Sequence, residues 1–243
     1  MRYAVLSDVH ANLEALEAVL EDARHQGVES LVCLGDFVGY GPDPNACVER
    51  LRGLLVAALV GNHDLAALGR LDAWRFNLFA RAAVEWTREQ LSPSVRAYLE
   101  GLQPRQTFEG MLLVHASPQD PVAEYILDWE TADDNFRAAE FSVCLFGHTH
   151  VPVRFAHDGV RTYVFPLAPN AAVKLERHLR HLINVGSVGQ PRDGDPRAAY
   201  VVLDTSARTL ELRRVLYPVE AVQAKMQARG LPRPLWERLS EGR

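Results

Sequence analysis

Short hydrophobic runs alternate with amphipathic stretches through the first half of the chain. Residues 3–6, 30–34 and 55–60 are apolar runs of strand length. Between them, apolar residues recur at helical spacing over residues 13–23 and again over residues 44–51. Each of these stretches is preceded by a capping side chain and followed by a glycine. The alternation predicts β-α-β units, whose parallel strands are buried on both faces of the sheet.

A long amphipathic helix is predicted between residues 71 and 91. Its polar residues run from Asn77 to Arg88 at spacings of four, four and three, opposite an aromatic and aliphatic stripe that we expect to pack. Ser92 and Pro93 then begin a shorter helix that ends near Gly101. We expect residues 71–101 to form a helical, lid-like insertion beside the loop that precedes them.

The second half of the chain consists mainly of β-type segments. They are short and separated by Asp-Gly, Pro or Gly turns, and Asp158-Gly159 is the strongest hairpin signal. We predict strands at residues 111–114, 142–146, 153–156, 160–165, 181–185, 200–204 and 210–215, and helices at residues 132–139 and 219–230. The last five strands predict a second, mostly antiparallel sheet. Because the chain has no internal repeat and no Gly/Ser linker, we expect two sheets packed in one domain that spans residues 1–243.

The composition is that of an ordinary globular protein, with 48% hydrophobic and 23% charged residues. The formal net charge of −5 argues against a general duplex-binding surface but leaves room for a local cationic pocket. Cys33, Cys47 and Cys144 are an odd number without C-x-x-C spacing, so neither a disulfide framework nor a thiolate zinc site is expected. No apolar run is long enough for a signal peptide or a membrane helix, and we therefore expect a cytoplasmic protein.

Polar side chains that can bind metal ions directly follow the predicted strands. They are Asp8, His10, Asp36, Asn62, His63, His115, His148 and His150. Ligands of an open α/β sheet bind beyond the carboxyl ends of the strands, so we expect these side chains to converge at one rim. Gly35, Gly61 and Gly147 would allow the backbone to turn sharply there.

The donor atoms of this set belong to carboxylates, imidazoles and one amide, without a thiolate. Such a mixed nitrogen and oxygen field suits Mn²⁺, Fe or Zn²⁺ better than Ca²⁺ or a structural zinc ion. Seven candidate ligands exceed what one catalytic ion uses, but two ions about 3.5–4 Å apart with one bridging carboxylate would use them all. Two metal ions at this separation serve phosphoryl transfer and related hydrolysis.

Five segments of the chain resemble the five motifs of the calcineurin-like metallophosphoesterase family, in the family's order and spacing. They are Asp8-Val9-His10, Gly35-Asp36-Phe37-Val38-Gly39, Gly61-Asn62-His63-Asp64, His115, and Gly147-His148-Thr149-His150. Residues 38–42, 86–93 and 186–192 also resemble the family's small bacterial and archaeal phosphodiesterase branch. The chain departs from that branch at Asn184-Val185, where the branch often has Asn-Pro. The resemblance implies an α/β (α+β) fold, a four-layer α/β/β/α sandwich of two mixed β-sheets flanked by helices.

The resemblance also implies how two divalent metal ions would be bound. The first ion would have as ligands Asp8, His10, Asp36 and His150, and the second Asp36, Asn62, His115 and His148. Asp36 would bridge the ions, because a carboxylate has two oxygens that can each reach a cation. Manganese is the expected metal, with iron, zinc, nickel or cobalt as alternatives.

A chemical mechanism follows from the same resemblance. A hydroxide held between the ions would attack phosphorus in line, while the ions neutralise the charge on the phosphoryl oxygens. His63 would donate the proton that the leaving alkoxide needs, and Asp64 would fix the tautomer of His63. A helix-capping role is the alternative for Asp64.

Four further polar residues are weaker candidates for substrate contacts. They are Asn12, Tyr40, Gln190 and Arg192. All four are predicted in loops that could face the same rim, and the planar guanidinium of Arg192 suits a phosphate group. The structural alternatives are a helix cap for Asn12, packing for Tyr40 and a solvated loop for the other two.

The residues and the resemblance together favour a metal-dependent phosphoesterase that acts on small phosphodiesters or nucleotides. The same reacting centre would also serve a phosphomonoesterase, a phosphoprotein phosphatase or a dinucleoside polyphosphate hydrolase, which differ in the walls of the site. A non-catalytic scaffold on the same fold is a further alternative. That alternative predicts a missing ligand or proton donor, and none is missing from the sequence.

Overall fold

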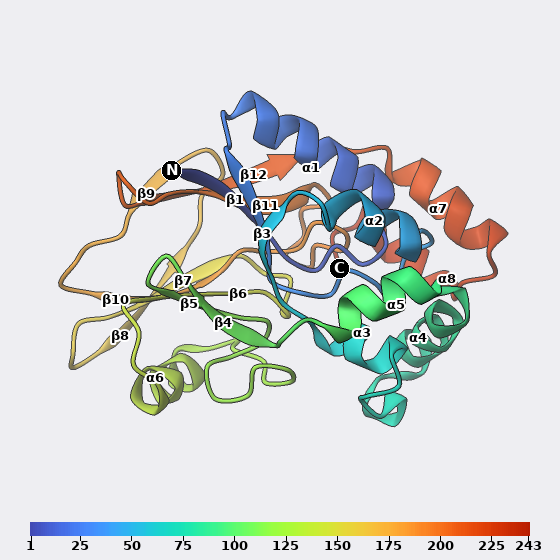
Figure 1. The fold of residues 1–243 in the computed structure, drawn as a ribbon. Coiled ribbons are helices and arrows are strands. Elements are labelled where there is room, and N and C mark those ends of the chain that lie inside the picture. The colour runs from blue at the N-terminus through green and yellow to red at the C-terminus, as the bar shows by residue number, and fades with distance from the viewer.

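The computed structural model describes residues 1–243 and contains two six-stranded β-sheets packed face to face, with helices on both outer sides (Figure 1). Each sheet includes both parallel and antiparallel neighbours. The predicted sandwich of two mixed sheets flanked by helices is therefore confirmed.

The first sheet has the strand order β3-β2-β1-β11-β12-β9. Its strands are β1 (Arg2–Leu6), β2 (Ser30–Cys33), β3 (Leu55–Ala58), β9 (Ala172–Lys174), β11 (Ala198–Asp204) and β12 (Thr209–Val215). The strands β1, β2 and β3 are parallel, as the β-α-β pattern predicts, whereas β11 and β12 extend the sheet in antiparallel pairing.

The second sheet has the strand order β4-β5-β6-β10-β7-β8. Its strands are β4 (Arg105–Phe108), β5 (Met111–Val114), β6 (Val143–Phe146), β7 (Val153–His157), β8 (Thr162–Pro166) and β10 (Arg180–Asn184). The strands β5, β6 and β10 are parallel, and Asp158-Gly159 lies in the β7–β8 hairpin as predicted.

The prediction that the late strands form a sheet of their own is wrong. The strands β7, β8 and β10 join β4, β5 and β6, whereas β9, β11 and β12 return to the first sheet. The spacing of apolar residues marks each strand but does not say which neighbour it pairs with. In this protein β11 pairs with β1, although almost the whole chain separates them.

The helices cover the outer faces of the two sheets. They are α1 (Leu13–His25), α2 (Pro44–Leu51), α3 (Asn62–Ala67), α4 (Leu78–Gln90), α5 (Pro93–Glu100), α6 (Trp129–Ala138), α7 (Val219–Ala228) and α8 (Arg233–Glu237), with 3₁₀ turns η1 (Ala73–Arg75) and η2 (Arg238–Ser240). Figure 1 shows α6 below the second sheet, α1 above the first sheet, and α4 and α5 at the right-hand end of the sandwich. The longest of them, α1 and α4, have 13 residues each, and no helix meets the length and apolarity that a bilayer crossing needs.

The helix predicted to begin at residue 71 begins at Leu78 instead. The side chain of Asn77 accepts hydrogen bonds from the main-chain N–H groups of Phe79 and Ala80, which makes it the N-cap. Part of the aromatic stripe is exposed as well, because 78% of the surface of Trp74 is accessible to solvent. A polar residue at helical spacing can therefore cap a helix rather than continue it.

Both faces of the central strands are buried, and the side chains alternate between two hydrophobic cores. In β1, Tyr3 and Val5 point into the core between the two sheets, whereas Ala4 and Leu6 point toward the helices over the first sheet. A smaller core lies between the second sheet and α6. The three cysteines are buried within these cores and unpaired.

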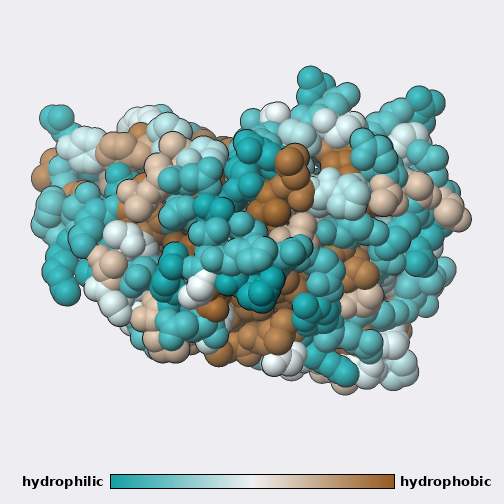
Figure 2. Space-filling view, turned by 90° about the horizontal axis from the view of Figure 1, so that it is seen from above, coloured by the Kyte–Doolittle hydropathy of each residue, from teal (hydrophilic) through white to brown (hydrophobic).

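Polar residues cover most of the helical face above the first sheet. Figure 2 looks down on this face and shows hydrophobic residues at the surface only in separate groups. Glu17 and Glu21 of α1 are exposed there, whereas Leu16 and Val19 of the same helix are buried against the sheet. The outer face of α1 therefore carries the polar half of its amphipathic pattern.

Asp22 joins α1 to the first sheet through three hydrogen bonds. Its carboxylate accepts one from the Tyr200 hydroxyl at 2.6 Å and two from the Arg213 guanidinium at 3.1 Å each. Burial opposes the charge of Asp22, but these hydrogen bonds prevail and lower its pKa below the ordinary value. The charged form of Asp22 is therefore more stable in the folded protein than in the unfolded chain.

We expect Asp22→Asn to lower the free energy of unfolding at pH 7 by about 1–3 kcal/mol, the range for hydrogen bonds to a charged group. A lowered folded-state pKa stabilises the protein fully above the unfolded pKa of about 3.9, and this stabilisation fades as the pH falls through the folded value. Urea unfolding at pH 7 and at acid pH should therefore show a difference from wild type that narrows below about pH 4.

Asp134→Asn is the matched control, because the Asp134 side chain is 67% exposed and its nearest cation is 3.7 Å away. Its effect should stay within about 0.5 kcal/mol. If the free energies of unfolding of Asp22→Asn and wild type differed by the same amount at every pH, the charge of Asp22 would contribute nothing to stability.

Candidate metal centre

Six parallel strands, three in each sheet, end at the same rim of the sandwich. The loops after β1, β2 and β3 carry Asp8, Asp36 and Asn62, and those after β5 and β6 carry His115 and His148. Main-chain hydrogen bonds tie these loops together: the Asp8 N–H donates to the Gly35 carbonyl at 3.0 Å, and the Gly147 N–H donates to the His115 carbonyl at 2.9 Å. The predicted convergence at one rim is observed.

The backbone at this rim is strained. Ten residues other than glycine have a positive φ, and seven of them lie in these loops: Asp8, His10, Ala11, Asp36, Tyr40, His148 and His150. A left-handed conformation costs a non-glycine residue roughly 1–2 kcal/mol. Strain of this kind persists only where the surrounding structure fixes it, which is typical of functional sites.

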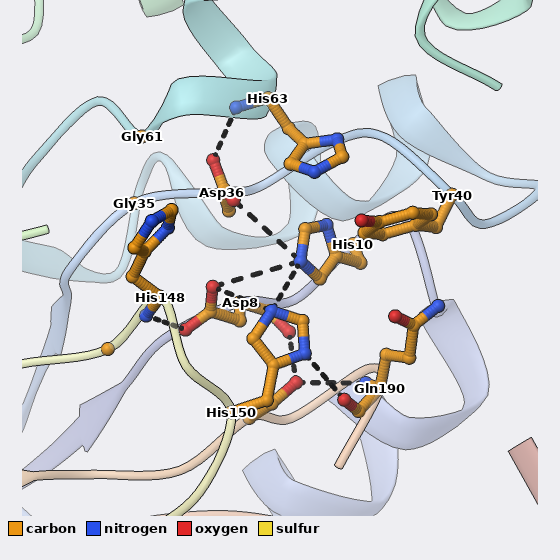
Figure 3. A network of polar contacts seen from close by, with 12 residues as sticks. Asp8, His10, Gly35, Asp36, Tyr40, Gly61, His63, His148, His150 and Gln190 are labelled. Atoms are coloured by element: carbon orange, nitrogen blue, oxygen red, sulfur yellow. Dashed lines mark hydrogen bonds and ion pairs between the residues drawn. The ribbon is translucent and has the colours of Figure 1, made fainter. Parts of the chain in front are cut away.

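The first group of candidate ligands comprises Asp8, His10 and His150 (Figure 3). The Nε2 atoms of His10 and His150 are 3.1 Å apart, and His150 Nε2 lies 3.2 Å from Asp8 Oδ1. That carboxylate oxygen is buried and accepts no hydrogen bond in the protein. The other oxygen, Oδ2, accepts one from the His148 main-chain N–H at 3.0 Å.

The tautomers of these histidines follow from their partners. The Nδ1 atom of His10 contacts the carbonyl oxygen of Val38, and that of His150 the carbonyl oxygen of Gln190. A carbonyl can only accept, so both Nδ1 atoms donate and both Nε2 atoms present lone pairs in the neutral rings. Two lone pairs and a carboxylate oxygen therefore face one point, which suits a cation. The residues fit a divalent metal ion.

A second group lies on the other side of Asp36. The Nδ1 atom of His115 donates to the carbonyl of Leu34 at 2.9 Å, so its Nε2 is directed at Asn62 Oδ1, 3.0 Å away. Asp36 Oδ2 lies 3.4 Å from His115 Nε2 and 3.7 Å from His10 Nε2. Asp36 thus belongs to the surroundings of both groups.

The two oxygens of the Asp36 carboxylate have different surroundings. Oδ1 accepts a hydrogen bond from the His63 main-chain N–H at 2.8 Å, and only Oδ2 faces the histidines of both groups. Gly61 is required beside it, because a Cβ atom on residue 61 would lie 2.0 Å from Asp36 Oδ1. Oδ2 is therefore the Asp36 oxygen that lies near the histidines of both groups.

The pKa values at the rim reflect burial and the two carboxylates. Burial lowers the pKa of His10 well below its ordinary value and that of His148 to about 3, so both rings are neutral at pH 7. Burial acts on His115 too, but the nearby charge of Asp36 outweighs it and raises the pKa of His115 to about 9. Neutral imidazole is the form that binds metal ions, and a metal would displace the proton of His115.

The structure brings His63 into a compact group with His10 and Asp36 but places His148 apart. His148 lies outside the compact ligand groups; its Nε2 contacts the carbonyl of Ala123 at 3.2 Å and its ring stacks on Tyr125. The ring of His63 lies 4.9 Å from that of His10 and 4.3 Å from that of Tyr40 (Figure 3). Its Nδ1 atom is buried and has no hydrogen-bond partner.

The tautomer role expected of Asp64 is wrong. Its two carboxylate oxygens accept hydrogen bonds from the main-chain N–H groups of Val38 and Gly61, each at 3.0 Å. These bonds cap α3 and fix the loop after β2, whereas His63 Nδ1 is left without a partner. The capping alternative describes Asp64, which supports His63 only by holding its helix.

A cavity of about 470 Å³ opens beside His63 and Asn62. Two of the four candidates for substrate contacts line it, and two do not. Tyr40 and Arg192 line it, and a guanidinium nitrogen of Arg192 donates to the Tyr40 hydroxyl at 3.2 Å. The Asn12 side chain instead caps α1 and donates to the Gly189 carbonyl. The Oε1 atom of Gln190 accepts from Arg192 at 2.8 Å. Asn12 is thus a structural residue, and Gln190 orients Arg192 rather than lining the cavity.

Two residues that brace the site were missing from the sequence-based set. Asn184, at the end of β10, donates from Nδ2 to the Gly147 carbonyl and to Thr149 Oγ1, and thereby holds the loop that carries two histidines. The Ser187 hydroxyl donates to the Asp8 main-chain oxygen at 2.9 Å. Asn184 directly follows an apolar run, which is the signal that identified the other site residues. Val185, where the resembling branch often has proline, is buried between the sheets.

Comparison with known proteins agrees with this geometry. A family model described as the calcineurin-like phosphoesterase superfamily domain matches residues 1–208. The uncharacterized protein MJ0912 of Methanocaldococcus jannaschii is 36% identical over 245 residues, which cover 99% of this chain and 98% of that protein. A solved metallophosphoesterase from Sphaerobacter thermophilus is 41% identical, with a TM-score of 0.89 over 100% of this chain and 99% of its own. The hypothetical protein PH1004 from Pyrococcus horikoshii OT3 has the same fold. It is 20% identical, with a TM-score of 0.80 over 100% of this chain and 98% of its own.

Proposed function

The chain belongs to the calcineurin-like phosphoesterase superfamily and is a hydrolase of phosphate esters, and from this premise we propose that it is a phosphodiesterase with two divalent metal ions, of which manganese is the first choice. The proposal includes the ligand sets expected from the sequence. Asp8, His10 and His150 would bind one ion together with Asp36. The second ion would be bound by Asp36, Asn62, His115 and His148.

One observation carries the proposal: the lone pairs of His10 and His150 face each other at 3.1 Å beside an oxygen of Asp8 that no donor contacts. Without a cation, this arrangement brings electron-rich atoms together in a buried place. On the other side of Asp36, His115 Nε2 lies 3.0 Å from Asn62 Oδ1, and loss of the His115 proton would leave two further ligand atoms beside each other. Two cations sharing Asp36 would satisfy both groups.

Bound divalent ions would supply a nucleophile from water at neutral pH and neutralise charge on the phosphoryl oxygens. A side chain of the protein would donate the proton that the leaving group needs. His63 lines the cavity beside the ligand groups, where a substrate ester oxygen would come within its reach. Burial lowers the pKa of His63 to about 4 in the free protein, but the negative charge of a bound phosphate and of a developing alkoxide favours the protonated ring. We assign His63 as the proton donor to the leaving group.

The cavity supports a diester rather than a small monoester. Its volume of about 470 Å³ is much larger than one phosphate group and lies within the range of small-molecule sites. Arg75 and Phe76, from the predicted insertion at residues 71–101, line this cavity together with His63. The insertion would thus act as a wall over the substituents of the phosphate, which is the lid-like role proposed for it.

The function is tested with the manganese-loaded protein and two aryl esters, bis(p-nitrophenyl) phosphate and p-nitrophenyl phosphate. We expect hydrolysis of both, with a higher kcat/KM for the diester, loss of activity after chelation and recovery on adding Mn²⁺. A rate that survives complete metal removal would contradict the proposal. A clear preference for the monoester would favour the phosphomonoesterase alternative.

His63→Ala should retain its metal content and lose about 10²–10⁴-fold in kcat on an alkyl or nucleoside diester, the range for general acid catalysis. Nitrophenolate leaves readily without a proton, so the loss on the aryl diester should be much smaller. The measurement is kcat on both substrates, with elemental analysis of each preparation.

His178→Ala is the matched control, because His178 is exposed and distant in sequence from every candidate ligand. Its kcat should equal that of the wild type on both esters. Equal losses of His63→Ala on the two substrates would mean that His63 positions the phosphate instead, and a loss of metal would make it a ligand.

A further inference from the structure

Three arginine side chains meet in the cavity beside the candidate metal centre, and no acidic residue lines it. Arg75 comes from η1, Arg192 from the loop after β10, and Arg238 from η2. The 13 lining residues include no aspartate or glutamate. In a protein whose net charge is −5, this is a local concentration of positive charge.

None of the three guanidinium groups has a side-chain carboxylate within 4.0 Å. Arg192 donates to the neutral acceptors Gln190 Oε1 and Tyr40 Oη, whereas Arg238 donates through Nε to a terminal main-chain oxygen of Arg243, which offsets part of its charge. The side chain of Arg75 makes no hydrogen bond within the protein. Other arginines of the chain are neutralised: Arg213, for example, contacts both Asp22 and Glu211.

The arginines of the cavity also repel one another. Partial burial and the nearby charge of Arg192 lower the pKa of Arg238, although Tyr40 acts in the opposite direction. Like charges brought close together destabilise a fold by a few kcal/mol at most in partly solvated surroundings, and an anionic ligand removes that cost. Since the three arginines come from separate elements, the fold itself brings them to one place.

We propose that the substrate carries a second phosphate group besides the one that is hydrolysed, and that Arg75, Arg192 and Arg238 bind this second group. The inference rests on the proposed function, because it places the scissile phosphate at the metal ligands. Those ligands account for one phosphate only, and the arginines line the same cavity as Asn62 and His63. A phosphate carries about −1.5 to −2 charges and three acceptor oxygens, which match several guanidinium forks better than a carboxylate does.

Two phosphonates that cannot be hydrolysed provide the test. Propylphosphonate carries one anionic group, and propane-1,3-diphosphonate carries a second on the same chain. Calorimetric titration of the manganese-loaded full-length protein should give a Kd for the diphosphonate about 10- to 100-fold lower. Arg238→Gln and Arg75→Gln should each reduce this ratio by about tenfold. Arg75→Gln serves as the second variant, because Arg75 is exposed and its loss breaks no hydrogen bond of the protein.

Arg233→Gln is the matched control for the change in charge. Arg233 lies on the same C-terminal segment as Arg238, but its side chain is 75% exposed, pairs with Glu237 and does not line the cavity. The ratio of the two Kd values should be unchanged in this variant. A ratio that fell equally in Arg233→Gln would show a general charge effect and overturn the inference.

Equal Kd values for the two phosphonates in the wild type, or a preference that both cavity variants retain, would also overturn it. The ester assay, run on the same preparation, separates this result from failure of the proposed function. Hydrolysis without a diphosphonate preference leaves the phosphodiesterase standing and refutes the second phosphate site. A diphosphonate preference without hydrolysis supports the arginine site and refutes the phosphodiesterase.

Discussion

The carboxylates of Asp8 and Asp36 are buried at the rim of the sandwich, and histidine rings are the only basic side chains within 4.0 Å of either. Burying charge without a strong counter-ion is expensive, and most of the surrounding histidines are neutral because burial lowers their pKa. Divalent cations would resolve this imbalance, since they would neutralise both carboxylates and use the lone pairs directed at them. The strained loops, the glycine at position 61 and the bracing by Asn184 all serve to hold these atoms in place.

Much of this arrangement could be predicted from the sequence, because two simple patterns determine it. Apolar runs of strand length identified β1, β2, β5 and β6 closely, and the polar residue just after each run identified its member of the site. Capping residues gave the limits of α1 and α5, where the side chains of Asn12 and Ser92 accept main-chain hydrogen bonds as predicted. Asp43, before α2, makes no such hydrogen bond. These features depend on local chemistry, which a sequence displays directly.

The features that could not be predicted depend on contacts between distant residues. Because β11 pairs with β1, the strands of the second half of the chain are divided between the two sheets. Asp64 accepts hydrogen bonds from the main-chain N–H groups of Val38 and Gly61. Sequence spacing alone cannot tell whether its carboxylate binds such groups or the neighbouring imidazole of His63. Arg75 and Arg238 lie in short 3₁₀ turns far apart in the chain, and only the folded structure shows that they line one cavity with Arg192.

Anomalous X-ray diffraction from crystals of the manganese-loaded protein would show whether the carboxylate of Asp36 is shared by two metal ions, as we propose. We expect two manganese peaks about 3.5–4 Å apart, both beside the carboxylate of Asp36. One peak should lie among Asp8, His10 and His150, and the other beside Asn62 and His115. A single peak at full occupancy, or two peaks of which neither contacts Asp36, would contradict it.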